Sequence, residues 1–396
     1  MKIDKAVIIG AGVAGPATAL ALRKCGIEST VYEAYDGTAS GIGGMLSVAP
    51  NGLATLGIIG VTLDNVGQPI RRQVIAEANG REMFGFDGLP GLPPTRVLQR
   101  DELHAALRDR AVAEGIRIVH GKRLAAVEET PREIVAHFGD GETARGDVLI
   151  GADGIRSKVR TLIDPFAPAP RYVGFLGLGG LAVGTDCDAP LDTMYFVFGK
   201  RAFMGYWRRP DGVVWFSNLP REQPLYAAEA REIPASVWLD ELKHVYADDV
   251  PGRDLVAHTR AEHVFVLGAQ DVLPPVPHWH RGRMVLVGDS AHAPSSSSGQ
   301  GASLALESSV ELARCLRDCE TPSGAFAAYE RLRRPRVEAI AAAAARTNNQ
   351  KAAGPIAKLV MNALLPIALK TFMSPRRMFG GTHGYRIDWE RRVTAA

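Results

Sequence analysis

Residues 6–33 read AVIIGAGVAGPATALALRKCGIESTVYE, and this stretch decides the fold prediction for the chain. An apolar run at 6–9 leads into closely spaced glycines. An alanine- and leucine-rich segment at 13–25 follows, and then residues 29–33, where β-branched side chains recur. This order predicts a strand, a tight turn, a helix and a second strand. It is the opening β-α-β unit of an α/β fold with a parallel sheet.

The glycines of the turn have the spacing G-x-G-x-x-G, with Ala14 before the third glycine. Gly10 permits the tight turn, Gly12 lets a pyrophosphate approach the backbone, and Gly15 lets helix and strand pack closely. Glu33 ends the second strand, where a carboxylate can accept both hydroxyls of an adenosine ribose and disfavours a 2′-phosphate. The first motif therefore predicts a site for the ADP half of a dinucleotide.

Two later segments also end an apolar strand with a glycine and an acid. Strand 147–150 runs into Gly-Ala-Asp-Gly, which contains Asp153, and strand 282–288 runs into Asp289. Ligands bind at the carboxyl ends of strands in open α/β sheets, so both acids are candidate ligand contacts. Asp289 can bond a sugar-alcohol hydroxyl, whereas Asp153 is equally well explained as a turn residue and helix cap.

The segment after Asp289 passes through a serine-rich loop to Gly299, Gly301 and Ala302, which precede a helix predicted from about residue 303. Backbone N–H groups at a helix start favour an anion, and a reduced flavin ring is one. His292 lies in the same loop. It can be an acid–base group, but a histidine that anchors the loop is the more common case.

In this order the three motifs resemble those of the FAD-dependent monooxygenases related to p-hydroxybenzoate hydroxylase, which include tetracycline-inactivating enzymes and phenol and salicylate hydroxylases. The resemblance covers nearly the whole chain. It implies non-covalent FAD, with the isoalloxazine beside residues 41–56 and the loop at 299–302. The implied cofactor contacts are Gly10, Gly12, Ala14, Gly15, Glu33, Arg100, Leu124, Asp153, Asp289, Gly299, Gly301 and Ala302.

The chain departs from the family pattern in the loop beside the flavin. Ser296 stands where the family usually has proline, and Ser303 where it has asparagine. A glycine-rich stretch at 175–180 lacks a preceding strand and a following helix, so we do not expect a second nucleotide site there.

The resemblance also implies the reaction. NADPH or NADH docks transiently and reduces the flavin, and molecular oxygen then forms a flavin hydroperoxide that hydroxylates an aromatic or polyketide-like molecule. No catalytic base is identifiable. A flavin-dependent dehydrogenase or desaturase, or a flavoprotein partner without turnover in a biosynthetic complex, remains open. The W-x-W-x-I-P signature of flavin halogenases and the second G-x-G-x-x-G of Baeyer–Villiger enzymes are both absent from the sequence.

The predicted architecture is α/β: a Rossmann-like FAD-binding domain of three-layer β-β-α type, an inserted antiparallel-sheet substrate domain and a C-terminal helix. The FAD domain is assigned to residues 1–65, 97–165 and 275–345, the substrate domain to 66–96 and 166–274, and a helical segment to 346–396. Strands at 193–198, 202–207 and 213–218 form a meander, and an alanine-rich helix covers 338–346. Pocket or core residues of the meander are Met194, Phe196, Phe198, Phe203, Trp215 and Phe216.

Composition fits a cytoplasmic globular protein, monomeric or homodimeric. Hydrophobic residues make up 46% and charged residues 22% of the 396 residues, and the net charge of +3 is spread along the chain, so neither nucleic acid nor membrane is expected as a partner. The four cysteines form no C-x-x-C or metal-ligand pattern. The apolar stretch at 359–369 is too short to span a bilayer.

Overall fold

The computed structural model describes residues 3–37, 44–351 and 375–394. Part of the expected isoalloxazine segment (41–43) and the apolar stretch at 359–369 lie outside these ranges. No helix in the described ranges is long and apolar enough to cross a membrane.

A six-stranded sheet forms the first half of the molecule, in the order β18-β19-β12-β1-β2-β8. All neighbouring strands are parallel except the edge pair β18–β19. The strand predicted at 282–288 is shorter in the structure, where β19 covers Met284–Leu286. It ends early because Gly288 adopts φ +63° and begins a 3-10 turn, Gly288–Ser290. The strands are β1 (Lys5–Ile9), β2 (Glu28–Tyr32), β8 (Arg117–Val119), β12 (Val148–Gly151), β18 (His280–Arg281) and β19 (Met284–Leu286).

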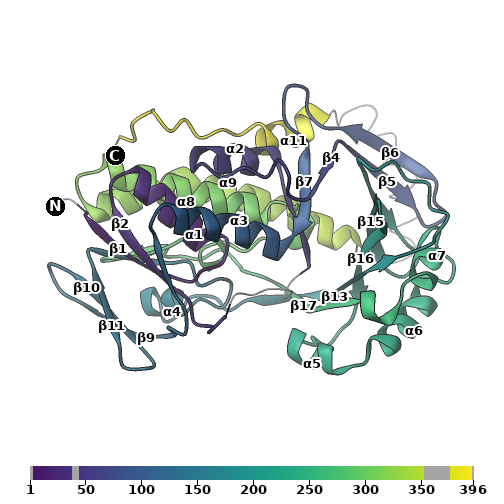
Figure 1. Cartoon of the computed structure of the whole chain (residues 1–396), viewed down its shortest axis with the longest axis horizontal. Helices are drawn as coiled ribbons and strands as arrows, with labels where there is room; N and C mark the ends of the chain where they lie inside the picture. The colour runs from purple at the N-terminus through teal and green to yellow at the C-terminus, as the bar shows by residue number, and fades with distance from the viewer. Residues whose placement is uncertain (1–2, 38–43, 352–374, 395–396) are drawn as a thin grey trace.

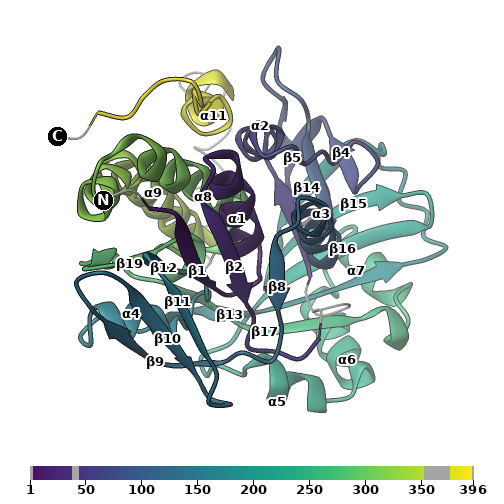
Figure 2. The same ribbon diagram turned by 60° about the vertical axis from the view of Figure 1, so that its left-hand side comes forward.

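Helices cover one face of this sheet and a small antiparallel sheet covers the other (Figures 1 and 2). The helical layer consists of α1 (Ala14–Lys24), α3 (Arg100–Ala113), α8 (Gly301–Asp318) and α9 (Pro322–Lys351). The opposite layer consists of β9 (Leu124–Glu129), β10 (Ile134–Phe138) and β11 (Thr143–Gly146). The predicted three-layer β-β-α arrangement is confirmed.

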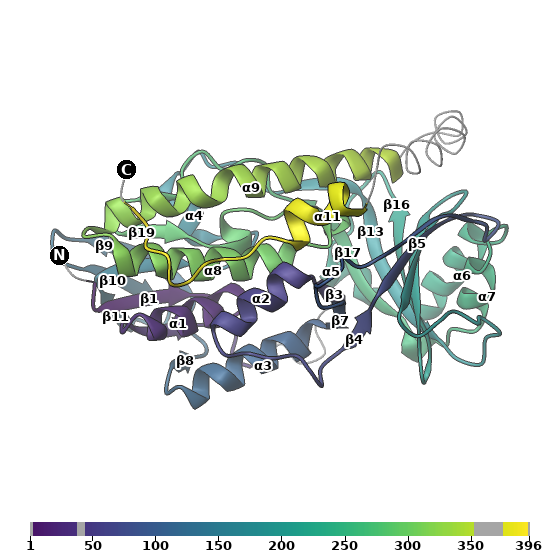
Figure 3. The same cartoon turned by 90° about the horizontal axis from the view of Figure 1, so that it is seen from above.

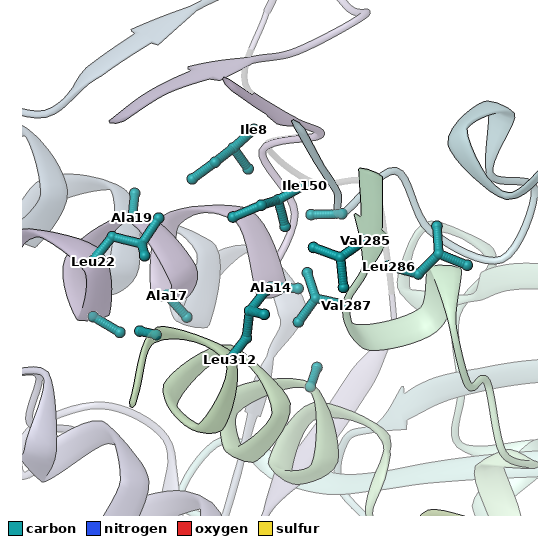
Figure 4. Close-up of a cluster of buried hydrophobic side chains, with 14 of the residues drawn as sticks. Ile8, Ala14, Ala17, Ala19, Leu22, Ile150, Val285, Leu286, Val287 and Leu312 are labelled. Carbon is teal, nitrogen blue, oxygen red and sulfur yellow. The ribbon is translucent and has the colours of Figure 1, made fainter. Parts of the chain in front are cut away.

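The core of this half lies between the parallel strands and helices α1 and α8 (Figure 4). Ile8 of β1 and Ile150 of β12 belong to this core, together with Ala17 of α1 and Leu312 of α8. Alanines on α1 let the helices approach the sheet and each other closely, which brings the start of each helix near the strand ends.

A seven-stranded sheet forms the second half, in the order β17-β13-β16-β15-β14-β5-β6. The predicted meander is present as β14–β15–β16, and β5 joins it in parallel with β14. Its strands are β5 (Arg72–Glu77), β6 (Glu82–Asp87), β13 (Arg171–Ala182), β14 (Thr193–Phe198), β15 (Phe203–Arg209), β16 (Gly212–Pro220) and β17 (Phe265–Val272). Helices α5 (Ala227–Glu232), α6 (Ala235–Val245) and α7 (Gly252–Ala257) pack on one face.

A small three-stranded sheet lies between the two halves, with β7 (Thr95–Gln99) in the middle and β3 (Met45–Val48) and β4 (Gln68–Ile70) at its edges. Helix α2 (Pro50–Ile58) follows β3 and packs on α8. The other helices in the described ranges are α4 (Lys158–Ile163), α11 (Pro375–His383) and the 3-10 turns Ala261–His263 and Ser296–Ser298.

The alanine-rich helix predicted at 338–346 is part of the much longer α9, which runs beside α8 (Figure 3). The prediction was too short because Pro335, which lacks an N–H group, normally ends a helix. Here α9 continues through Pro335, and the buried Phe326, Tyr329 and Arg333 fix the preceding turns against the core. A domain boundary at 345/346 would therefore fall inside one helix.

Candidate functional site

The first motif contacts each of the other two through its glycine turn. Gly10 has φ +103°, and a Cβ atom there would lie 2.4 Å from the carbonyl oxygen of Ala152, in the second motif. A Cβ atom on Gly288, in the third motif, would lie 2.9 Å from the Cβ of Ala14. Segments far apart in the sequence therefore meet at the same sheet edge, and the glycines permit the close approach.

The second and third motifs are joined through Ser290. Its hydroxyl accepts a hydrogen bond from the Gly154 N–H at 2.9 Å and donates one to Asp153 at 3.1 Å. Asp153 also accepts bonds from the Ser157 hydroxyl and from the N–H groups of Lys158 and Val159. The carboxylate thus bonds the loop and the start of α4, and these contacts favour the interpretation of Asp153 as a turn and helix-cap residue.

The N-termini of α1 and α8 are both open. Neither Val13 nor Gln300, the N-cap residues, makes a side-chain capping bond, and neither helix has an acid in its first turn. A Cβ atom on Gly12 or Gly301 would meet no described atom within 4 Å. By contrast, α3 closes its own start with a capping box. Free N–H groups, the helix dipole and open space together suit a phosphate at α1 and an electron-rich ring at α8.

The Glu33 side chain is held in place by backbone N–H groups of the glycine turn and of the chain after β2. One carboxylate oxygen accepts the Ala11 N–H at 2.8 Å and the other accepts the Tyr35 N–H at 3.1 Å. A carboxylate has about four acceptor sites, so both oxygens can still accept from ribose hydroxyls. The end of β2 thus presents an oriented acceptor beside Gly10.

Asp289 lies in the 3-10 turn Gly288–Ser290 that follows β19, and the residue is exposed to solvent between the buried Gly288 and Ser290. Burial raises the pKa of its carboxyl to about 6, and the positive charge of Arg100 opposes this rise. Arg100 begins α3, and its backbone N–H bonds the Gly44 carbonyl. Asp289 and Arg100 thus provide an acid and a guanidinium suited to hydroxyls and phosphates, and together with the open helix starts they fit FAD.

Leu124 and His292, two further residues singled out from the sequence, are both buried. Leu124 begins β9 and is 7% exposed within the main core. His292 is buried, its Nε2 lies 2.8 Å from the Ser308 hydroxyl, and burial together with the charge of Arg333 lowers its pKa to about 3. The imidazole is neutral at ordinary pH, and its contact with α8 fits the loop-anchoring role.

The loop beside the start of α8 is fastened to β3 and α2. Ser47 donates to the Gly299 carbonyl at 3.3 Å, and the Asn51 amide donates to the Gln300 side chain at 2.9 Å. Ser303, which replaces the family's asparagine, accepts the Ala49 N–H at 3.2 Å. The serine that stands in place of the family's asparagine therefore makes a hydrogen bond that holds the chain after β3.

A buried charge network lies behind this loop, and it was not predicted from the sequence. Asn51 donates to Glu307 at 2.7 Å, Arg333 pairs with it at 2.7 Å, and Arg336 does so at 2.8 Å. Glu307 and Arg333 are both 0% exposed. The arginine-rich run at 333–336 was the available signal, but its partners lie far away in sequence.

The seven-stranded sheet turns one apolar face toward β3. Met45 packs against a cluster on this face that contains Met194 and Trp207, and Phe196 and Phe216 pack there too. Trp215 points to the opposite face, where its Nε1 donates to the Thr259 hydroxyl at 2.9 Å. Of the six residues predicted to line a pocket or the core, Trp215 therefore belongs to the core on the covered face, and Phe216 lies on the face toward β3.

These features define a Rossmann-type dinucleotide-binding protein with an inserted antiparallel sheet. Residues 4–344 match the family model described as "FAD binding domain", and the chain belongs to this family. It is 30% identical to an FAD-dependent urate hydroxylase of Klebsiella pneumoniae, over 84% of this chain and 86% of the relative. It is also 30% identical to the 3-amino-4-hydroxybenzoate 2-monooxygenase of Streptomyces cremeus, over 83% of each chain.

The crystal structure of a variant of Klebsiella pneumoniae HpxO complexed with FAD superposes with a TM-score of 0.83 and 25% identity, covering 96% of this chain and 97% of that one. The expected family, the fold, FAD as the cofactor and the class of FAD-dependent monooxygenase are confirmed.

Proposed function

We propose that this protein binds FAD non-covalently and uses NADPH or NADH and molecular oxygen to hydroxylate an aromatic or polyketide-like small molecule. One observation carries the proposal: β3 links the two parts of the candidate site, because Ser47 bonds the loop before the open start of α8 and Met45 packs on an apolar face of the seven-stranded sheet. The names of the relatives, a hydroxylase and a monooxygenase, support it.

The residues proposed to hold FAD are given in order from the adenine end of the cofactor to the flavin ring. The ADP half would rest on the first motif and Glu33, with Leu124 toward the adenine and Arg100 at the pyrophosphate. Asp289 would bond the ribityl chain, and Gly299, Gly301 and Ala302 would face the ring. Asp153 would act through the loop that it anchors. The contacts as a set are Gly10, Gly12, Ala14, Gly15, Glu33, Arg100, Leu124, Asp153, Asp289, Gly299, Gly301 and Ala302.

Bound FAD supplies the redox chemistry, taking a hydride from the nicotinamide and activating oxygen for transfer to the substrate. The protein's part is to bind, orient and exclude water. The uncapped α8 start favours a negatively charged ring, and the apolar side chains beyond β3 keep water from the reacting atoms. The cofactor domain is proposed as residues 1–65, 97–165 and 275–345, and the substrate domain as 66–96 and 166–274.

The purified protein tests the proposal. It should absorb in the blue and release FAD on mild denaturation, and an aromatic substrate should stimulate NAD(P)H oxidation. Under ¹⁸O₂ the product should gain one labelled oxygen atom. A product that lacks two hydrogens instead would show a desaturase, and a folded protein that cannot be reconstituted with FAD would refute the proposal.

A further inference from the structure

One cross-strand row of the seven-stranded sheet alternates phenylalanine and glycine. The row passes through five adjacent strands, from β17 to β14, and its members are paired directly. They are Phe265, Gly179, Phe216, Gly205 and Phe196. It continues onto β5 at Ile75. Directly paired residues share a face, so all of these positions lie on the face that β3 approaches.

The aromatic rings lie over the glycines. A Cβ atom on Gly205 would lie 2.3 Å from two ring carbons of Phe216, and a Cβ atom on Gly179 would lie 2.1 Å from the Phe265 ring. Any side chain at these glycines would lift the rings off the sheet, because such distances are far inside van der Waals contact. The glycines therefore let the rings of Phe216 and Phe265 lie close against the sheet.

This row is accessible although it crosses the middle of the sheet. Phe265, Phe216 and Phe196 are all partly exposed. The other face of the same strands is covered: Trp215 is 0% exposed and Val197 is 2% exposed, against α6 and α7. Partly exposed aromatic rings at the centre of a sheet form an apolar surface of the kind that binds ligands.

The row also adjoins the segment that leads to the proposed cofactor site. A Cβ atom on Gly44 would lie 2.8 Å from Leu267 of β17, and Met45 packs beside Phe196 and Phe216. Two residues further on, Ser47 bonds Gly299 of the loop before α8. A molecule lying on the row would thus be next to the site proposed for the flavin ring.

The rows next to this one on the same face carry no cationic side chain. The rows on either side carry Leu181, Val214 and Trp207 on one side, and Gly177, Asn218 and Phe203 on the other. None of these residues is cationic. The nearby Glu77 of β5 is paired with Arg81. A carboxylate lying on these described rows would find no cation in them to offset its desolvation.

We propose that this row is the floor of the substrate pocket, and that Gly205 with Phe216 selects a neutral, planar, fused-ring aromatic substrate. The inference rests on the proposed function and specifies the substrate class of that site. A flat ring stacks on Phe216 and Phe196, and the lack of a cation in the described rows of the floor disfavours ring carboxylates. Gly205 sets the height of the Phe216 ring, and hence the thickness of ring that fits.

The test measures binding to the FAD-loaded protein, without turnover. 2-Naphthol and 3-hydroxy-2-naphthoate are titrated near pH 7, and the change in the flavin absorption spectrum gives each Kd. The neutral naphthol should bind about tenfold or more tightly than the naphthoate, which corresponds to about 1.4 kcal/mol. Gly205→Ala should weaken naphthol binding by about tenfold, in line with the usual cost of overpacking.

Gly180→Ala is the matched control. Gly180 lies on the covered face, where a Cβ atom would meet Thr259 and the Trp215 ring, so this variant should lower Tm but change the naphthol Kd less than about twofold.

Three results would each overturn the inference. They are equal effects of the two glycine variants on naphthol binding, binding of the naphthoate that is as tight as or tighter than that of the naphthol, and no naphthol binding to yellow, folded protein. Failure to bind FAD at all would instead refute the proposed function.

Discussion

The Gly154 N–H donates to the Ser290 hydroxyl at 2.9 Å, and this bond ties the ends of β12 and β19 together. Ser290 is fully buried and also donates to Asp153. The two acids that follow these strands are thereby fixed relative to each other, which a cofactor that contacts both loops requires.

Ser290→Ala should therefore loosen both loops at once. It leaves a buried N–H without an acceptor, which costs about 1–3 kcal/mol. We expect a lower Tm and weaker FAD retention, measured by thermal unfolding and by flavin content after dialysis. Ser236→Ala, at an exposed position of α6, should change neither.

Gly10 and Gly12 should respond differently to the same added methyl group. Gly10→Ala places a Cβ 2.4 Å from the Ala152 carbonyl at φ +103°, so the apoprotein should be destabilised, by about 1–3 kcal/mol or more. Gly12→Ala meets no described protein atom, so the apoprotein should keep its Tm while FAD affinity falls. If both variants unfold alike, Gly12 has a structural rather than a ligand-approach role.

Glu33→Ala removes the acceptor that the Ala11 and Tyr35 N–H groups orient. We expect the affinity for FAD to fall much more than the affinity for FMN, which lacks the adenosine. Fluorescence titration of the apoprotein with each flavin measures the ratio. Glu28→Ala, an exposed residue of β2, is the control, and an equal loss for FMN and FAD would contradict the ribose assignment.

Asp289 should make the stability of the apoprotein depend on pH. Its folded pKa, about 6, is above the ordinary value of 3.8, so between these values the folded state binds the proton more tightly than the unfolded state. Stability should therefore fall as pH rises from about 4 to 6, relative to Asp289→Asn, and the difference should level off above this range. Thermal unfolding of both proteins across pH measures it, and a gap independent of pH would contradict the assignment.

Glu307→Gln should test the buried network behind the flavin loop. Burial opposes ionisation, but Arg333 and Arg336 outweigh it and lower the pKa of Glu307. The substitution leaves Arg333 buried without its counter-charge, which should cost about 3–5 kcal/mol in denaturant unfolding. The stabilisation that Glu307 provides should be lost as pH falls through its lowered pKa. Glu114→Gln removes the exposed partner of Arg110 and should cost at most about 1 kcal/mol.

Local patterns in the sequence determined the cofactor half of the protein. The opening strand, turn and helix, the strands that end at the two later acids, and the helix after Gly301 were all predictable, because apolar periodicity and glycine spacing are read within a few residues. The length of α9 was not, since its burial against the core outweighs the local effect of Pro335.

Tertiary structure alone decided which residues meet. Trp215 and Phe216 face opposite sides because they are adjacent in β16, but only the packing of α6 and α7 decides that the Trp215 side is the covered one. Phe216 finds glycine on both sides only through the register of β13, β16 and β15. Asn51 and Glu307 meet because α2 packs on α8. Such contacts depend on the pairing of distant segments, which no local stretch of sequence encodes by itself.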